Sequence, residues 1–288
     1  MATAEFEYET AFSRNIGWFT EAEQASLRSK RVAIAGSGGV GGIHALTLAR
    51  LGISNFQLAD FDTFGVENFN RQVGATMSTV GKEKVGVMET MLKDINPTAT
   101  INSFEDGVNI NNIDAFLDGV DLYVDSLDFF AMDARRLVFS KCAERGIPAV
   151  TAAPLGMGTA FLCFMPGEMT FEDYFGLSQA ETETELYLRF YLGLAPTAMQ
   201  SAYLVDASRL DLKAKKGPST IIGCTLCAGV AASYAVKILL NRGDLIVAPQ
   251  GMHWDPYLNK TEITSLEGGA DNPGFLEALA NAKSAFNI

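Results

Sequence analysis

The sequence predicts an α/β protein with a doubly wound mixed sheet, parallel in its first half and with antiparallel strands added in its second half. Strand-like and helix-like segments alternate strictly up to about residue 153, which is typical of βαβ units and a parallel sheet. A glycine-rich stretch, GSGGVGG, directly follows the first apolar run. After residue 157 the alternation stops, and residues 251–264 resemble paired strands around a Pro/Asn turn.

The first half divides into five strands and the helices between them. Short apolar runs that end in glycine or acidic residues are typical of buried parallel strands. Residues 78–95 show a helical pattern that stops before Asn96 and Pro97, where proline prevents continuation. The expected strands are 31–36, 55–62, 99–105, 121–128 and 147–154, and the expected helices are 44–52, 78–95, 112–119 and 131–146.

The second half is less regular. It offers a strand at 157–166, an acidic helical piece at 180–193, a turn-rich stretch at 213–219 and a long apolar helix at 220–243. No linker is visible, so we expect one domain over residues 1–288. Its parts are an N-terminal helical segment (1–30), a first half (31–155), an irregular crossover (167–218) and a closing helix, strands and tail (219–288).

Composition excludes several classes of protein. The formal net charge of −12 argues against non-specific nucleic-acid binding, which needs a positive surface. The N-terminus lacks the basic and apolar regions of a signal peptide. No uninterrupted apolar run reaches the roughly 18 residues of a membrane span. Four cysteines are too few for a disulfide scaffold in a chain of this length. We therefore expect a cytoplasmic protein without a membrane or nucleic-acid partner.

The glycine stretch predicts a nucleotide site. Gly36, Gly38 and Gly41 fit the pattern G-x-G-x-x-G after a strand and before a helix, and Gly39 lies within it. Glycines let the backbone approach a phosphate, and a helix N-terminus offers free N–H groups. Asp60 follows at the end of the second strand, where an acid accepts ribose hydroxyls. NAD enzymes share this arrangement, so a dehydrogenase and an ATP enzyme remain open at this point.

The stretch DFDTFGVENFNRQ, residues 60–72, favours ATP. A dehydrogenase has no need of Arg71 and Gln72 behind the ribose acid, nor of Lys84 in GKEKV. Cations near phosphates suit phosphoryl or nucleotidyl transfer, in which charge develops on a leaving group. Asp128, at the end of the fourth strand, is placed to hold Mg²⁺, which prefers carboxylate and phosphate oxygens. Each residue also has a structural alternative: Asp62 as a turn cap, Arg71 as a surface ion pair, Lys84 as a solvated helix lysine.

Four motifs, GSGGVGG, ADFDTFGVENFNRQ, GKEKV and VDSLD, resemble the ATP-binding core of the ThiF/MoeB/HesA family. That family comprises adenylyltransferases that activate ubiquitin-like sulfur carriers, and it includes the ubiquitin-activating enzymes. The resemblance covers residues 12 to about 155 and extends to the helix at 219–241. It implies a Rossmann-like fold and a reaction in which a protein or peptide carboxylate attacks the α-phosphate of Mg·ATP. The products are an acyl-adenylate and pyrophosphate.

The resemblance also implies roles for single residues. Asp60 would bind the ribose, and Asn68, Arg71 and Lys84 the phosphates, while Asp128 would bind magnesium. Arg14, in FSRNIG, matches the family's N-terminal arginine that reaches into the partner subunit's site, which implies a homodimer. The nucleotide would contact Gly36, Gly38, Gly39, Gly41, Asp60, Asp62, Asn68, Gln72 and Lys84, and the groups expected to take part in catalysis are Arg14, Arg71, Lys84 and Asp128.

The cysteines depart from the family pattern. Many members use a cysteine in the crossover, but residues 164–223 contain none, and Cys142 and Cys163 lie in apolar surroundings typical of buried small hydrophobes. We therefore expect adenylation without a catalytic cysteine. Cys224 and Cys227 form a single C-x-x-C pair, whereas tetrahedral zinc needs four ligands, so no zinc is expected.

Other functions remain as alternatives. One is an NAD(P)-binding oxidoreductase, and another is a non-catalytic partner subunit of the same family. Retention of Arg14, Asn68, Arg71, Lys84 and Asp128 argues against the second, because a scaffold would not need them. The two histidines, His44 and His253, are interpreted as packing residues.

Overall fold

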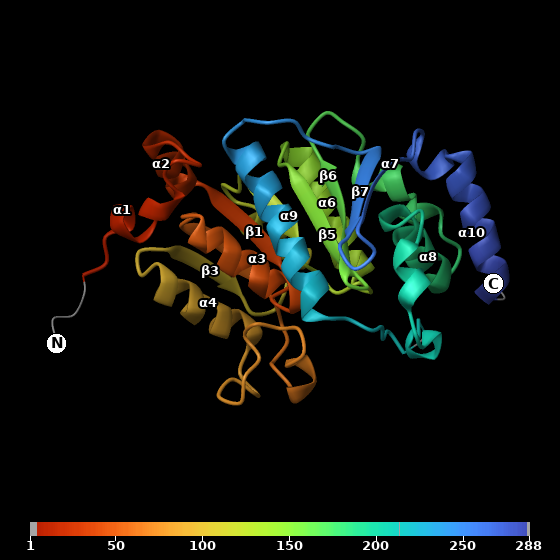
Figure 1. Cartoon of the computed structure of the whole chain (residues 1–288), viewed down its shortest axis with the longest axis horizontal. Coiled ribbons are helices and arrows are strands. Elements are labelled where there is room, and N and C mark those ends of the chain that lie inside the picture. The colour runs from red at the N-terminus through yellow and green to blue at the C-terminus, as the bar shows by residue number, and fades with distance from the viewer. Residues whose placement is uncertain (1–4, 213, 287–288) are drawn as a thin grey trace.

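The computed structural model describes residues 5–212 and 214–286. They form one eight-stranded sheet in the order β3-β2-β1-β4-β5-β6-β7-β8 (Figure 1). The strands β3, β2, β1, β4 and β5 run parallel, and β6, β7 and β8 are added antiparallel. The predicted fold class is confirmed. The strands are β1 Arg31–Ala35, β2 Asn55–Ala59, β3 Thr100–Phe104, β4 Leu122–Asp125, β5 Ala149–Leu155, β6 Gly158–Phe164, β7 Gln250–Asp255 and β8 Lys260–Ser265.

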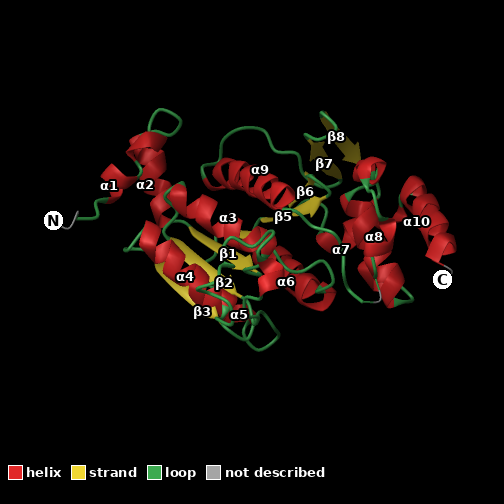
Figure 2. Ribbon diagram, turned by 60° about the horizontal axis from the view of Figure 1, so that its bottom comes forward, coloured by secondary structure: helices red, strands yellow, loops and turns green. Residues whose placement is uncertain are grey.

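Helices cover both faces of the sheet, as Figures 1 and 2 show. Both faces of β1 are apolar, because successive side chains of a strand point to opposite faces of the sheet and all of those from Val32 to Ala35 are hydrophobic. Val32 and Ile34 pack with α3 (Gly39–Arg50), α4 (Lys84–Ile95) and α9 (Ile221–Leu239). Ala33 and Ala35 pack with α5 (Ile113–Phe116) and α6 (Met132–Arg145). The doubly wound layers therefore follow from the sequence of the strands themselves.

The remaining helices lie at the two ends of the sheet (Figure 1). At the N-terminal end, α2 begins with a capping box in which Thr20 and Glu23 bond each other's backbone N–H groups. In the crossover, α7 and α8 pack on each other, and α10 packs on α8. These elements are α1 Tyr8–Ala11, η1 Ser13–Asn15, α2 Glu21–Ser29, α7 Phe171–Phe175, η3 Leu177–Gln179, α8 Glu183–Leu194, η4 Met199–Tyr203, η5 Ala207–Arg209, η6 Gly269–Asp271 and α10 Pro273–Phe286.

Two helix starts differ from the sequence prediction. The helix expected from residue 78 begins only at Lys84, because residues 78–83 form turns in which Gly81 has a φ of +78° and Thr79 donates to the Gly74 carbonyl. The helix expected from residue 44 begins at Gly39, so the second half of the glycine stretch is already helical. The glycines there pack closely, which overrides their low helix propensity.

Strand ends also move relative to the prediction. Strand β2 ends at Ala59 and β4 at Asp125, so Asp60, Asp62 and Asp128 lie in loops just beyond the strands. All three therefore sit at the carboxyl edge of the parallel sheet, where ligands of such folds bind.

Helix α9 is the long apolar helix that the sequence predicts over residues 220–243. Within the described residues it alone is long and apolar enough to cross a membrane, with 19 residues and a mean hydropathy of 1.7. The helix packs against β5, β6 and α3, and half of the apolar stretch is buried. These are the contacts of a core helix.

Candidate nucleotide site

The glycine loop is a place where two backbone segments cross. The Gly36 N–H donates to the Ala59 carbonyl at 2.7 Å. A Cβ on Gly36 would lie 2.2 Å from the Ser126 carbonyl oxygen, and one on Gly41 would lie 1.7 Å from the Gly36 carbonyl oxygen. No side chain fits at either position. The loop leads directly into α3, whose first N–H groups are free of intrahelical partners and suited to an anion.

Asp60 is fixed by the glycine loop. Its carboxylate accepts the Ser37 N–H at 2.5 Å and the Asp62 N–H at 2.8 Å. Burial raises the pKa of Asp60, and these two backbone hydrogen bonds act in the opposite direction. The structure thus places a hydrogen-bond acceptor at the end of β2, beside the loop, as a ribose-binding acid requires.

Asp62 and Lys84 form an ion pair at the same edge. The Lys84 ammonium lies 2.9 Å from the Asp62 carboxylate. The lysine side chain is 8% exposed and the aspartate 54%. Lys84 is therefore not the solvated helix lysine of the structural alternative. It is a sequestered cation at the first position of α4, held next to the Asp60 loop by an exposed acid.

Three further predicted residues lie on the loop after β2. Arg71 donates to the Glu67 carbonyl at 3.1 Å and to the Asn70 amide oxygen at 2.9 Å, and its Cγ would lie 3.7 Å from a Cβ on Gly39. The Gln72 amide reaches within 3.5 Å of a Cβ on Gly38, and its Oε1 is buried without a hydrogen-bond partner in the described residues.

Asn68 instead accepts the Gly65 N–H at 2.9 Å and shapes the loop. Arg71 and Gln72 therefore face the glycine loop, and Gln72 retains an unused acceptor there. A buried acceptor without a partner is costly, so a bound group that donates to Gln72 fits the site.

Asp128 lies three residues beyond the end of β4. Its side chain is exposed, and its Oδ1 accepts the Phe130 N–H at 3.0 Å. Residues 5–212 and 214–286 contain no group of three or more His, Cys, Asp or Glu arranged around a metal. Mg²⁺ is commonly held by one or two carboxylates together with substrate phosphates, so a single carboxylate at this edge fits a metal that arrives with a nucleotide.

Arg14 is not brought to this site within its own subunit. It is exposed on η1, and the neighbouring Asn15 donates to the carbonyl of Arg50, the last residue of α3. The glycine loop lies at the other end of α3, about 18 Å away for a helix of this length. Figure 1 shows this segment at the opposite end of α3 from the glycine loop.

The residues that support the site from neighbouring segments could not be identified from the sequence. Ser126 carries the carbonyl that Gly36 crosses, and Cys224 on α9 would lie 3.2 Å from a Cβ on Gly39. Asp125 and Arg135 form a buried ion pair at 2.9 Å beneath the Asp128 loop. The two acids in DLYVDSLD were visible in the sequence, but nothing local indicated that the first would be buried and paired.

His44 links α3 to Ser126, the residue after β4 against which Gly36 packs. It is fully buried in α3, and its Nδ1 lies 3.1 Å from the Ser126 hydroxyl oxygen. Its Nε2 has no partner among the described residues. Burial lowers the pKa of His44 to about 4, so the folded state holds it neutral. The interpretation of His44 as a packing residue agrees with this burial.

We predict that His44 makes the protein less stable at acidic pH. Between pH 6.5 and pH 4 the unfolded chain binds a proton at His44 that the folded chain does not, so stability falls as pH decreases. The full effect is roughly 3 kcal/mol. Urea unfolding at pH 7 and pH 4.5 should show a smaller pH difference for His44→Gln than for the wild type. An identical pH difference in both proteins would contradict the prediction, and His253→Gln gives the comparison for the second buried histidine.

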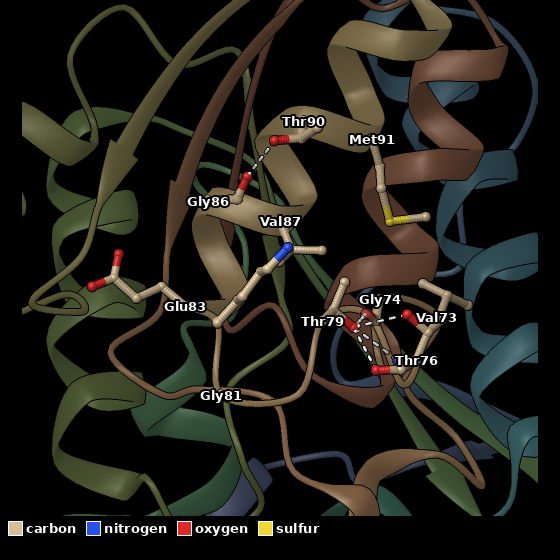
Figure 3. A pocket seen from close by; sticks show the side chains of 11 residues that line it. Val73, Gly74, Thr76, Thr79, Gly81, Glu83, Gly86, Val87, Thr90 and Met91 are labelled. Carbon is tan, nitrogen blue, oxygen red and sulfur yellow. Dashed lines mark hydrogen bonds between the residues drawn. The ribbon is translucent and has the colours of Figure 1, made fainter.

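A cavity of about 660 Å³ lies between residues 73–83 and α4 rather than in the glycine loop. Figure 3 shows it between the loop of Val73 and Thr79 and the α4 residues Val87, Thr90 and Met91. Neither Asp60 nor any residue of the glycine loop lines it. We therefore place the candidate nucleotide site at the glycine loop, where the acid, the cations and the helix N-terminus meet, and not in this cavity.

Comparison with known proteins identifies the family. The model of the ThiF family matches residues 12–273. The chain belongs to the ThiF family. The resemblance found in the four sequence motifs is confirmed, and the match extends beyond them through the crossover and α9. The protein is thus adenylyltransferase-like and nucleotide-binding, as members of this family are.

Curated relatives match about half of the chain. The tRNA threonylcarbamoyladenosine dehydratase of Haemophilus influenzae is 33% identical over 150 residues, 52% of this chain and 57% of that protein. The heterocyst protein HesA of Trichormus variabilis is 34% identical over 149 residues, 52% of this chain and 55% of that protein. The chain therefore spans about half the length of the curated relatives it matches.

Solved structures share the fold over most of the chain. PaaA superposes with a TM-score of 0.69 at 16% identity and covers 92% of this chain and 75% of its own. Escherichia coli MccB with ATP gives 0.65 at 20% identity, with coverages of 94% and 74%. E. coli TcdA with AMP gives 0.61 at 20% identity, with coverages of 84% and 98%. At these identities the likeness shows the fold alone.

Proposed function

We propose that this protein is an ATP- and magnesium-dependent adenylyltransferase that activates a carboxylate as an acyl-adenylate and releases pyrophosphate. One observation carries the proposal. Arg71 lies against the glycine loop at the N-terminus of α3, and Lys84 pairs with Asp62, two residues beyond the ribose-type acid Asp60. Membership of the ThiF family supports the same reaction.

The residues act on two anions that must meet, a carboxylate and a triphosphate. The glycine loop and Asp60 bind and orient the nucleotide, and Arg71 and Lys84 offset the negative charge of the phosphates. Lys84 would exchange its Asp62 partner for a phosphate oxygen when ATP binds. Asp128 would hold Mg²⁺, which when bound neutralises charge that grows between the α- and β-phosphates.

The proposed substrate is a protein or peptide carboxylate, such as the C-terminus of a ubiquitin-like protein or sulfur carrier. The net charge of −12 disfavours a tRNA substrate, since binding to nucleic acid needs a positive surface. Cys142, Cys163, Cys224 and Cys227 are all buried, which supports adenylation without a catalytic cysteine. We propose a cytoplasmic location, as the cysteine usage suggests.

We predict that Mg·ATP binds and NAD does not. Arg71 and Lys84 favour a triphosphate over a dinucleotide, whose pyrophosphate carries less charge. Calorimetric titration with Mg·ATP and with NAD compares the two ligands directly. Exchange of labelled pyrophosphate into ATP, with candidate carboxylates present, then tests adenylation. Tighter binding of NAD would favour the oxidoreductase, and ATP binding without any exchange would favour the non-catalytic partner subunit.

We predict a homodimer in which Arg14 acts in the other subunit's site. Within its own subunit Arg14 lies at the far end of α3 from the glycine loop, so only a second copy supplies it there. Mixing inactive Arg14→Ala and Asp128→Ala subunits should restore up to about a quarter of the activity. The mixed dimer contains one intact composite site, and both parent homodimers contain none. Absence of recovery after verified subunit exchange would refute the arrangement.

A further inference from the structure

The segment that carries Asp128 has little of its own to hold it in place. It leaves β4 at Asp125, and the Asp128 side chain is exposed with one hydrogen bond, to the Phe130 N–H. A metal-binding carboxylate must be held within about 0.5 Å of its working position. The groups that fix this segment therefore belong to the elements that pack around it.

Arg135 holds the segment from beneath. Arg135 is buried, with 2% of the residue exposed. Its guanidinium donates to the carbonyls of Leu127 at 2.7 Å, Asp128 at 3.1 Å and Phe129 at 3.2 Å. The same group lies 2.9 Å from the Asp125 carboxylate. Three consecutive carbonyl oxygens thus accept hydrogen bonds from one guanidinium. Only arginine has enough donors in a fixed plane for this arrangement.

Helix α8 of the crossover holds the segment from outside. The Phe190 ring lies 4.5 Å from the Arg135 guanidinium carbon and 5.3 Å from the Phe129 ring. The Tyr187 ring lies 4.9 Å from the Phe130 ring, edge to face. Tyr187 and Phe190 are three residues apart and share one face of α8. Both residues that follow Asp128 therefore pack on this face.

The crossover reaches the same face from its other end. The Tyr187 hydroxyl donates to Glu183 at 2.6 Å, and Glu183 pairs with Lys215 at 2.9 Å. Lys215 belongs to the turn-rich stretch that leads to α9. The stretch before α9 is thus linked to α8 through Glu183 and Tyr187.

We propose that α8 is the positioning platform for Asp128, with Tyr187, Phe190 and Arg135 as positioning residues. The inference rests on the proposed function, and it assigns the crossover a second task beside covering the sheet end.

The test compares two phenylalanines of the same aromatic cluster. Phe190 contacts the Asp128 segment, whereas Phe175 contacts Phe190 with ring centroids 5.1 Å apart and has no aromatic contact with Phe129 or Phe130. Phe190→Leu and Phe175→Leu are therefore matched in chemistry and in burial, and they differ in contact with the Asp128 segment. Melting temperature checks that the two variants lose similar stability.

Hydrogen–deuterium exchange of the full-length protein gives the first measurement. The amides of Leu127, Phe130 and Ala131 should exchange about tenfold faster in Phe190→Leu, because the segment opens locally without its aromatic contacts. In Phe175→Leu they should not change. Equal acceleration in both variants, or none in Phe190→Leu, would overturn the proposal. Should Phe190→Leu fail to fold, Phe130→Ala removes the contact with Tyr187 from the segment itself.

Titration of ATP binding with Mg²⁺ gives the second measurement. In Phe190→Leu the Mg²⁺ concentration for half-maximal effect should rise severalfold, and the affinity for ATP without metal should stay as in the wild type. Arg135→Lys, which keeps the charge and loses the planar fork, should act in the same direction. Equal loss of ATP affinity with and without Mg²⁺ would overturn the positioning role. If the wild type fails to bind ATP the proposed function fails, while the exchange measurement still decides the role of α8.

Discussion

Asp128→Ala is expected to lower the maximal rate of adenylation by about 10²–10³-fold. The residue is exposed in a loop beyond β4 and contributes one hydrogen bond to the Phe130 N–H, so the fold should persist. The lost rate reflects charge that grows in the transition state, which the metal held by Asp128 would offset. Steady-state kinetics of pyrophosphate exchange measures the effect, and the melting temperature serves as the folding control.

Asp133→Ala is the matched control for this variant. It removes the same charge from an exposed aspartate only five residues along, in the first turn of α6. Its kinetics should stay near those of the wild type. If Asp128→Ala keeps a near-normal maximal rate, or raises only the Michaelis constant, the residue stabilises the ground state and the transition state equally. The magnesium assignment would then be wrong.

The fold could be predicted because its determinants are local. Val32 and Ile34 alternate with Ala33 and Ala35, and this pattern alone defines a strand buried on both faces with larger residues on one side. The start of α4 could not be predicted. Residues 78–83 have a helical pattern, but the hydrogen bond from Thr79 to Gly74 and the left-handed Gly81 divert them into turns.

Some residues of the candidate site could be predicted from the sequence, and others could not. The glycine loop and Asp60 are separated by the spacing of one βαβ unit, so the sequence predicts that they lie close together. The burial of Lys84 against Asp62 and the contact of Cys224 with Gly39 depend on how distant segments pack. Arg135 is the clearest case. It reads as one charge on a helix face, and only the tertiary fold shows that it binds three carbonyls of the Asp128 segment.

Gly41→Ala is expected to have the largest effect on stability. The added Cβ would lie 1.7 Å from the Gly36 carbonyl oxygen and 3.0 Å from the Ser126 Cβ. A backbone oxygen inside a crossing of two segments cannot move aside, so the loop and α3 must shift together. We expect a loss of about 3 kcal/mol in the free energy of unfolding, the upper part of the range for overpacking. Urea unfolding measures it.

Gly86→Ala gives the comparison that isolates the crossing. Gly86 also lies in the first turns of a helix, α4, but no atom comes within 4 Å of its added Cβ. Alanine there should stabilise the protein by about 0.5–1 kcal/mol, because the unfolded chain loses conformational freedom. The two substitutions are chemically identical and should change stability in opposite directions.

In calorimetry Gly41→Ala should also lose ATP binding, since the displaced loop no longer presents its N–H groups to a phosphate. A Gly41→Ala protein that keeps both wild-type stability and ATP binding would show that α3 does not pack against the Gly36 carbonyl and Ser126 as described. Wild-type stability with lost ATP binding would instead confine the role of Gly41 to the ligand.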